Sequence, residues 1–160
     1  MEINRELWGK SACGKEIYLY TLKNANGSYV QVSNLGAAFV SAVVPDKEGN
    51  LADVVLGYPV AESYFGDGPC AGKIPGRYAN RIALGRFTLE GKEYELPINN
   101  GPNHLHGGPE GFQNKVWESR EHEGGVEDNL LHECKGVLVV LHGFAAESCD
   151  DVGSDAAVRN

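Results

Sequence analysis

Short apolar runs separated by glycine-containing turns recur along this sequence. Residues 86–89 and 92–96 show the pattern most clearly, because Glu90-Gly91 separates them and the apolar side chains within each run stand two positions apart. A period of two is typical of a half-buried β-strand. No stretch of the sequence keeps the helical period of about 3.6 over several turns. We therefore predict a mainly β fold, an antiparallel β-sandwich.

Further strands are predicted where β-branched and aromatic residues cluster between turns. The predicted ranges are 17–22, 29–32, 39–44, 54–56 and 137–141. The first two flank Asn26-Gly27, which favours a hairpin because Asn-Gly readily adopts the positive φ of a tight turn. The 21 glycines in 160 residues are nearly twice the usual share and agree with a fold that has many turns.

The charge balance argues against a nucleic-acid-binding protein. The 14 basic and 22 acidic residues leave a net charge of −8, and no Lys/Arg cluster is present to bind phosphates. No apolar run approaches the roughly 20 residues of a membrane span, and the N-terminal residues lack the apolar stretch of a signal peptide. We expect a cytoplasmic protein that binds neither nucleic acid nor a membrane, with its four scattered cysteines as free thiols.

Two glycine-rich stretches, residues 66–82 and 99–112, carry most of the side chains suited to a binding or catalytic site. Such loops often hold functional residues in β proteins, because rigid strands keep the loop ends in place. Within the first stretch, residues 68–73 are similar to a phosphate-binding loop. However, the glycine spacing is wrong, and Ile74 stands where a magnesium-binding Ser or Thr is required. This segment is predicted to be a turn.

His104 and His106 would point the same way from a strand, as a pair of metal ligands could. These two histidines are the only candidate metal ligands in this stretch, and no HExxH or CxxC motif accompanies them, so no metal site is predicted. Gly107-Gly108 instead allows close backbone approach beside the His106 ring, as a small-ligand pocket requires. Farther along, His142-Gly143 is similar to the start of an α/β-hydrolase oxyanion loop, but no nucleophile elbow follows it.

Two motifs within the glycine-rich stretches resemble the aldose 1-epimerase (galactose mutarotase) family. They are GRYANRI at 76–82 and NNGPNHLHGGPEGF at 99–112, and their order and spacing match the family. The upstream DVVLG at 53–57 also suits it, so that the resemblance covers roughly residues 5–120. The resemblance implies a galactose mutarotase-like supersandwich, incomplete in this chain. It also implies interconversion of the α and β anomers of free aldohexoses without a cofactor.

The same resemblance implies where a sugar would bind. By position, Asn80 and Arg81 are similar to the family's sugar-contacting Asn-Arg pair, and His106 to its pocket histidine beside the ring oxygen and the anomeric centre. A neutral sugar offers hydroxyls and a ring ether, so it must be recognised by directional hydrogen bonds. The planar guanidinium of Arg81 can donate to two neighbouring hydroxyls, which a lysine cannot imitate.

Anomer interconversion also needs a base to take the anomeric proton and an acid to protonate the ring oxygen. The family's acid is a second histidine and its base a glutamate far downstream, and no catalytic residue can be matched to either here. His122, His132 and His142 lack the expected sequence context. We therefore expect little turnover. The alternatives are a non-catalytic sugar-binding β-sandwich fragment and an inactive truncated product.

The sequence changes character after residue 128. Residues 1–128 are expected to form the N-terminal part of a mutarotase-like sandwich. Residues 129–160 do not resemble the family. A frameshift in the coding sequence, or a truncation, would produce such a tail. Apart from the strand predicted at 137–141, this tail is small, polar and acidic, so we expect it to pack poorly.

Overall fold

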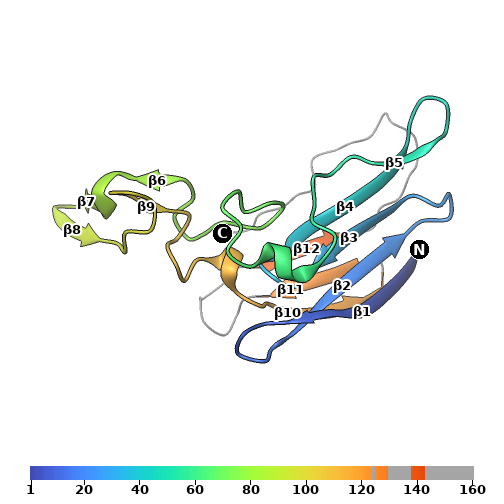
Figure 1. Cartoon of the computed structure of the whole chain (residues 1–160), viewed down its shortest axis with the longest axis horizontal. Coiled ribbons are helices and arrows are strands. Elements are labelled where there is room, and N and C mark those ends of the chain that lie inside the picture. Colours follow the sequence, from blue (N-terminus) through green and yellow to red (C-terminus); the bar gives the residue numbers. More distant parts are fainter. Residues whose placement is uncertain (124, 130–137, 143–160) are drawn as a thin grey trace.

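The computed structural model describes residues 1–123, 125–129 and 138–142. Its largest unit is a five-stranded antiparallel sheet with the order β1-β2-β3-β4-β5 (Figure 1). The strands are β1 (Glu2–Lys10), β2 (Glu16–Lys23), β3 (Tyr29–Ser33), β4 (Ala38–Pro45) and β5 (Leu51–Asp53). The strands predicted at 17–22, 29–32 and 39–44 are thus confirmed.

The strand predicted at 54–56 is wrong, because β5 lies just before it and ends at Asp53. The Asp53 carboxylate accepts hydrogen bonds from the backbone N–H groups of Ala42 and Val55, both at 3.0 Å. A side chain that bonds its own backbone two residues on replaces the ladder with a turn. The apolar residues that follow therefore leave the sheet instead of extending it.

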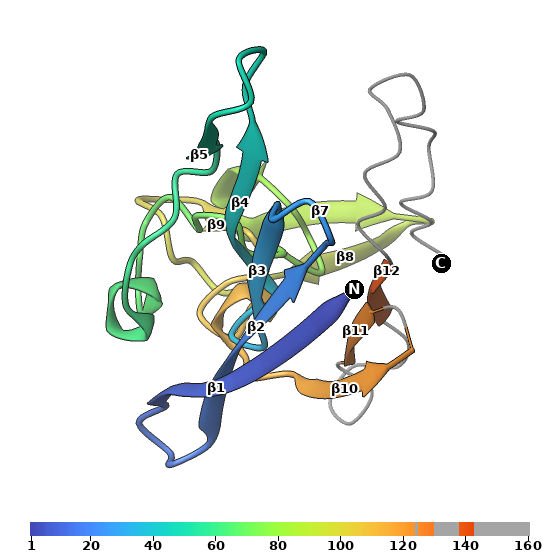
Figure 2. The same cartoon turned by 90° about the vertical axis from the view of Figure 1, so that its right-hand side faces the viewer.

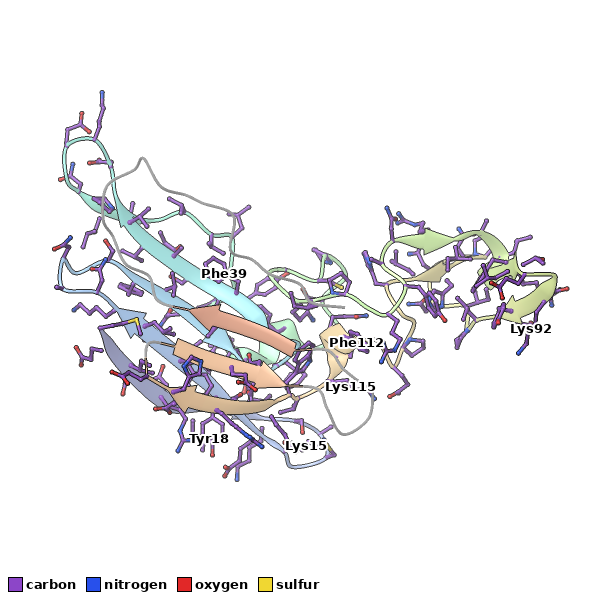
Figure 3. The ribbon with its side chains drawn as sticks, turned by 180° about the vertical axis from the view of Figure 1, so that it is seen from behind. Lys15, Tyr18, Phe39, Lys92, Phe112 and Lys115 are labelled. Atoms are coloured by element: carbon purple, nitrogen blue, oxygen red, sulfur yellow. The ribbon has the colours of Figure 1, made fainter. Side chains whose placement is uncertain are left out.

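A second, three-stranded antiparallel sheet lies against one face of the first (Figure 3). Its strands are β10 (Glu118–His122), β11 (Gly125–Asn129) and β12 (Leu138–His142). Val126 of β11 packs into a buried cluster with Tyr20, Leu22 and Val32 of the large sheet. Two sheets packed over an apolar interior confirm the predicted β-sandwich. The strand expected at 137–141 is β12, although Val137 lies outside the described residues.

The other face of the large sheet is covered by the segment after β5, which lies on the side away from β10–β12 (Figure 2). This segment includes the 3-10 helix η1 (Ala61–Tyr64). Ala61 and Tyr64 are buried against Ile17, Leu19 and Val40 of the sheet. The Tyr64 ring also contacts Trp8 and Tyr58, at centroid distances of 5.4 and 5.0 Å.

A small lobe projects from one end of the sandwich (Figure 1). It contains β6 (Arg81–Ile82), η2 (Ala83–Gly85), β7 (Arg86–Leu89), β8 (Lys92–Glu95) and β9 (His104–Leu105). The hairpin predicted around Glu90-Gly91 is β7–β8, in which Phe87 lies opposite Tyr94 with the rings stacked at 5.1 Å. Lys92 marks the far tip of this lobe, and Phe112 of η3 (Phe112–Asn114) lies where the chain rejoins the sandwich (Figure 3).

The segment that was similar to a phosphate-binding loop is a turn, as predicted. Its Lys73 is fully buried, in an ion pair with the equally buried Asp67 and a 2.7 Å hydrogen bond to the carbonyl oxygen of Tyr64. Asp67 in turn accepts the N–H of Ala71 at 2.8 Å. Because the lysine amine is used inside the protein, it cannot reach a phosphate in solvent.

Cys13 and Cys70 are free thiols, while Cys134 and Cys149 lie outside the described residues. Among the helices of the described ranges, none is both long and apolar enough to cross a membrane.

Candidate functional site

The lobe brings Asn80 and His106 together, although they are 26 residues apart in sequence. β6 pairs with β9 so that Arg81 lies opposite Leu105 and Ile82 opposite His104. Just beyond this pairing, the backbone N–H of His106 donates to the carbonyl oxygen of Asn80 at 3.1 Å. The N–H of Asn80 donates to Nδ1 of the His106 ring at 3.0 Å. Two reciprocal hydrogen bonds thus close the end of the two-stranded ladder.

Both residues have positive φ, 62° at Asn80 and 52° at His106. This left-handed conformation is uncommon for residues other than glycine and tends to occur at functional sites. It stops the regular alternation of side chains at the end of β6 and β9. The His106 ring therefore turns back over the Asn80 backbone instead of continuing the strand.

The bond from Asn80 decides which nitrogen of His106 carries the proton. Because Nδ1 accepts a hydrogen bond, the neutral ring must hold its hydrogen on Nε2. His106 is half-buried. The ring is thus held as a hydrogen-bond donor with a defined direction.

Arg81 is exposed and is held at one of its guanidinium nitrogens. Its Nε–H donates to Oδ1 of Asn100 at 2.9 Å, which leaves both terminal nitrogens as a planar fork of donors. The backbone N–H of Arg81 donates to Oδ1 of Asn80 at 2.9 Å. That bond orients the Asn80 amide so that its NH2 group is also a donor. The three predicted residues are therefore neighbours along one short ladder.

A group of asparagines that the sequence analysis did not assign supports this ladder. The Asn99 amide clamps Leu105, accepting its N–H at 2.7 Å and donating to its carbonyl oxygen at 3.0 Å. Oδ1 of Asn103 accepts the N–H of Leu84, a residue with a positive φ of 52°. Asparagine commonly replaces missing ladder bonds in irregular backbone. The repeated asparagines of the second motif were the sequence signal for this role.

His104 has a structural role that differs from that of His106. It is 1% exposed, its Nδ1 lies 2.8 Å from the carbonyl oxygen of Pro97, and its ring meets Tyr78 edge-on at 6.1 Å. A carbonyl only accepts, so Nδ1 of His104 is the donor. Within the described ranges, no group of three or more His, Cys, Asp or Glu side chains could hold a metal ion.

The glycine pair after His106 serves the lobe's own packing. A Cβ on Gly107, which has a φ of 84°, would lie 1.7 Å from the carbonyl oxygen of Gly76. A Cβ on Gly108 would lie 3.1 Å from the His104 ring. The close approach expected beside His106 is therefore made by the chain itself, between the two sequence motifs.

A groove of about 350 Å³ lies elsewhere, between the strands β1–β2 and β10. Its lining includes Arg5, Tyr18, Trp117 and Arg120, and none of the three predicted sugar-contacting residues. Arg5 stacks over the Tyr18 ring at 4.8 Å and lies 3.8 Å from the Glu121 carboxylate, so its charge is already partnered. The groove is a seam between the two sheets and is separate from the lobe.

Comparison with known proteins places residues 18–137 within the family model described as aldose 1-epimerase. The chain is 48% identical to galactose mutarotase of Bos taurus over 98 residues, which are 61% of this chain and 29% of that protein. It is 39% identical to aldose 1-epimerase of Escherichia coli (strain K12) over 105 residues, 66% of this chain and 30% of the relative. The chain thus spans less than a third of the length of these curated relatives.

Two solved structures are similar to the fold described above. An aldose epimerase homologue from C. elegans superposes with a TM-score of 0.63 at 34% identity, covering 69% of this chain and 34% of that one. Galactose 1-epimerase from Lactobacillus acidophilus NCFM also gives a TM-score of 0.63, at 26% identity, covering 79% of this chain and 37% of that one.

Proposed function

The chain belongs to the aldose 1-epimerase family, and on that premise we propose that its lobe binds a free aldohexose through Asn80, Arg81 and His106. The observation that carries this proposal is the fixed His106 ring, whose Nδ1 accepts the Asn80 N–H at 3.0 Å. A ring held in this way presents its Nε2–H in one direction, and the Arg81 guanidinium is held separately by Asn100. A sugar is recognised by such directional donors.

Each of the three side chains has a distinct part in this binding. The Arg81 fork donates to two neighbouring sugar hydroxyls, and the Asn80 amide NH2 group donates to a third oxygen. Nε2–H of His106 donates to the ring oxygen, whose lone pairs point into the site. The Arg81 backbone N–H holds the Asn80 amide, and Asn100 holds the Arg81 guanidinium at Nε, so each of these donors has a partner that orients it when the sugar leaves.

These three residues bind a sugar but do not move its protons. A guanidinium and an amide are not bases at neutral pH, and His106 could accept a second proton only by breaking its bond from Asn80. Interconversion of the α and β anomers needs a separate acid and base. We therefore propose sugar binding with mutarotation near the spontaneous rate for this 160-residue chain.

Titration of the ¹⁵N-labelled chain with galactose and with glucose tests the binding. We expect roughly millimolar affinity, about −4 kcal/mol, with backbone shifts concentrated at residues 78–82 and 100–108. Polarimetry on freshly dissolved α-galactose tests turnover. No shifts in the lobe at about 50 mM sugar would contradict the binding, and rates within about tenfold of a full-length relative would contradict the assignment of a binding role alone.

A further inference from the structure

Asparagine followed by glycine occurs twice in this chain, at Asn26-Gly27 and at Asn100-Gly101. Such a pair is chemically labile, because a glycine nitrogen has no neighbouring Cβ to shield it and can attack the side-chain amide of the asparagine. The two sites differ in the hydrogen bonds made by the nucleophile, which is the glycine nitrogen. They also differ in those made by the electrophile, which is the asparagine side-chain amide.

The nucleophile is tied at one site and free at the other. The N–H of Gly27 donates to the carbonyl oxygen of Asn24 at 3.2 Å, within the turn between β2 and β3. Gly101 is exposed, has a positive φ of 55°, and donates its N–H to no acceptor among the described residues. An N–H that already donates must break its hydrogen bond before it can attack. Gly101 is therefore the better nucleophile.

The electrophile is activated at Asn100. Its Oδ1 accepts the Nε–H of Arg81 at 2.9 Å, and a guanidinium keeps its positive charge at all physiological pH values. A charged donor on this oxygen stabilises the negative charge that develops there when Cγ is attacked. Asn26 donates its backbone N–H to Oδ1 of Asn24 at 2.9 Å, and no donor of the described ranges bonds its side chain.

The backbone around Asn100 can also open without disturbing a sheet. Asn100 and Asn103 form an isolated bridge, in which each N–H donates to the other's carbonyl oxygen at 3.0 Å. Gly101 and Pro102, the two residues between them, are exposed. Turning Asn100 toward the geometry of attack therefore breaks two hydrogen bonds and no strand pairing, so the rearrangement is local.

We propose that Asn100 is a site of spontaneous modification, at which Arg81 promotes conversion to aspartate and isoaspartate. The Gly101 nitrogen gives its proton to a solvent base and forms a bond to Cγ of Asn100, while Oδ1 becomes an oxyanion held by Arg81. When the oxyanion collapses, the bond from Cγ to Nδ2 breaks and ammonia leaves with a proton taken from water. Water then opens the cyclic succinimide, at Cγ to give aspartate or at the backbone carbonyl carbon to give isoaspartate.

The modification changes how Arg81 is held. A carboxylate in place of the amide accepts from Nε and from a terminal guanidinium nitrogen together, which removes one donor from the fork. Isoaspartate also lengthens the backbone by one carbon inside the Asn100–Asn103 bridge. Both products therefore lower the affinity of the lobe for a sugar. The conversion itself depends on Asn100, Gly101 and Arg81, and does not require that the lobe binds sugar.

Peptide mapping by mass spectrometry, on the full 160-residue chain kept at pH 7.5 and 37 °C, measures conversion at both sites. In the folded chain we expect Asn100 to convert at least about threefold faster than Asn26. In denaturing urea both sites lose their hydrogen bonds, and the two rates should come close together. Asn26 converting as fast as Asn100 in the folded chain would overturn the proposal.

Arg81→Met tests the activation. It should slow conversion at Asn100 about three- to tenfold and leave Asn26 unchanged, because it removes the hydrogen bond to the oxyanion. Arg86→Met is the matched control, since Arg86 is exposed in the same lobe and donates to Glu95 instead. It should leave both rates unchanged. An equal or faster rate at Asn100 in a folded Arg81→Met chain, verified by its ¹H–¹⁵N spectrum, would overturn the part given to Arg81.

Galactose titration of the fresh and the aged chain is a separate readout. We expect binding to be lost in proportion to the fraction converted at Asn100. Full affinity in a converted chain would overturn the effect inferred for Arg81. A fresh chain that binds no galactose, while Asn100 converts as described, would contradict the sugar site in the lobe and leave the modification site supported.

Discussion

The Nδ1 atom of His106 accepts the backbone N–H of Asn80 at 3.0 Å, while the carbonyl oxygen of Asn80 accepts the backbone N–H of His106 at 3.1 Å. This pair of bonds places the proton of the neutral ring on Nε2. We expect long-range ¹H–¹⁵N spectra of the unliganded chain at neutral pH to show the Nε2–H form as the main species. A dominant Nδ1–H form would contradict the donor role given to this ring.

Arg81 and Asn100 are predicted to act as one unit in sugar binding, because Asn100 holds the guanidinium at Nε. Arg81→Lys should weaken galactose binding about five- to tenfold, since an ammonium cannot reproduce the planar fork. Asn100→Ala should weaken it about two- to fivefold by freeing the guanidinium. In the double variant the two losses should not add.

Arg86→Lys is the control for this pair. Arg86 lies in the same lobe, is exposed, and donates from Nη2 to Glu95 at 3.0 Å. Its substitution should leave galactose affinity unchanged in the same titration. Additive losses for Arg81→Lys and Asn100→Ala would show that the two side chains contribute separately.

Lys73→Met is predicted to destabilise the chain by about 3–5 kcal/mol, because it leaves the buried Asp67 carboxylate without its partner. Replacing both residues, as Lys73→Met with Asp67→Leu, should recover most of that loss. Lys47→Met is the control, since Lys47 and Glu48 form an exposed pair at 3.4 Å and should contribute less than about 1 kcal/mol. Urea unfolding measures all three. Equal losses at Lys73 and Lys47 would contradict the importance of the buried pair.

The sandwich could be predicted from the sequence where β-branched and aromatic residues cluster between turns, as in β2, β3 and β4. β1 was missed because its burial pattern is mostly exposed, with charged residues on both sides of an edge strand. The strand predicted at 54–56 was wrong for a different reason. Its residues are β-formers, but the Asp53 carboxylate takes the backbone bonds that would continue the strand.

The candidate site was predictable in its residues and not in its geometry. Asn80, Arg81 and His106 were selected by resemblance, and their roles in sugar binding remain predictions. The pairing of β6 with β9, only two residues on each strand, is too short for any periodicity to reveal. Asn99 and Asn100 accept hydrogen bonds from Leu105 and Arg81, the neighbours of His106 and Asn80. The positive φ values at Asn80 and His106 could not be predicted, because these residues are not glycines.

Asp128 is 4% exposed and lies opposite Ser119 in the β10–β11 pairing. Burial raises the pKa of this carboxyl from 3.8 to about 6, against a smaller lowering by the Ser119 hydroxyl. The folded chain therefore binds a proton more readily than the unfolded chain between these two values. Above pH 6 the buried carboxylate is charged and lowers the free energy of unfolding by its full penalty, at most about 3 kcal/mol. As pH falls from about 6 to about 4, protonation of Asp128 in the folded chain removes this penalty progressively.

Asp128→Asn tests this contribution, because the amide has a similar shape and no charge at any pH. We expect the variant to unfold at higher urea concentration than the unsubstituted chain at pH 7.5, and the difference to shrink toward pH 4.5. The difference between the two proteins is the quantity to follow. Asp46 and Asp53 have lowered pKa values from hydrogen bonds to their carboxylates, so they favour the folded state at high pH in both proteins. A stability difference that stays constant from pH 4.5 to 7.5 would show that Asp128 does not titrate in this range.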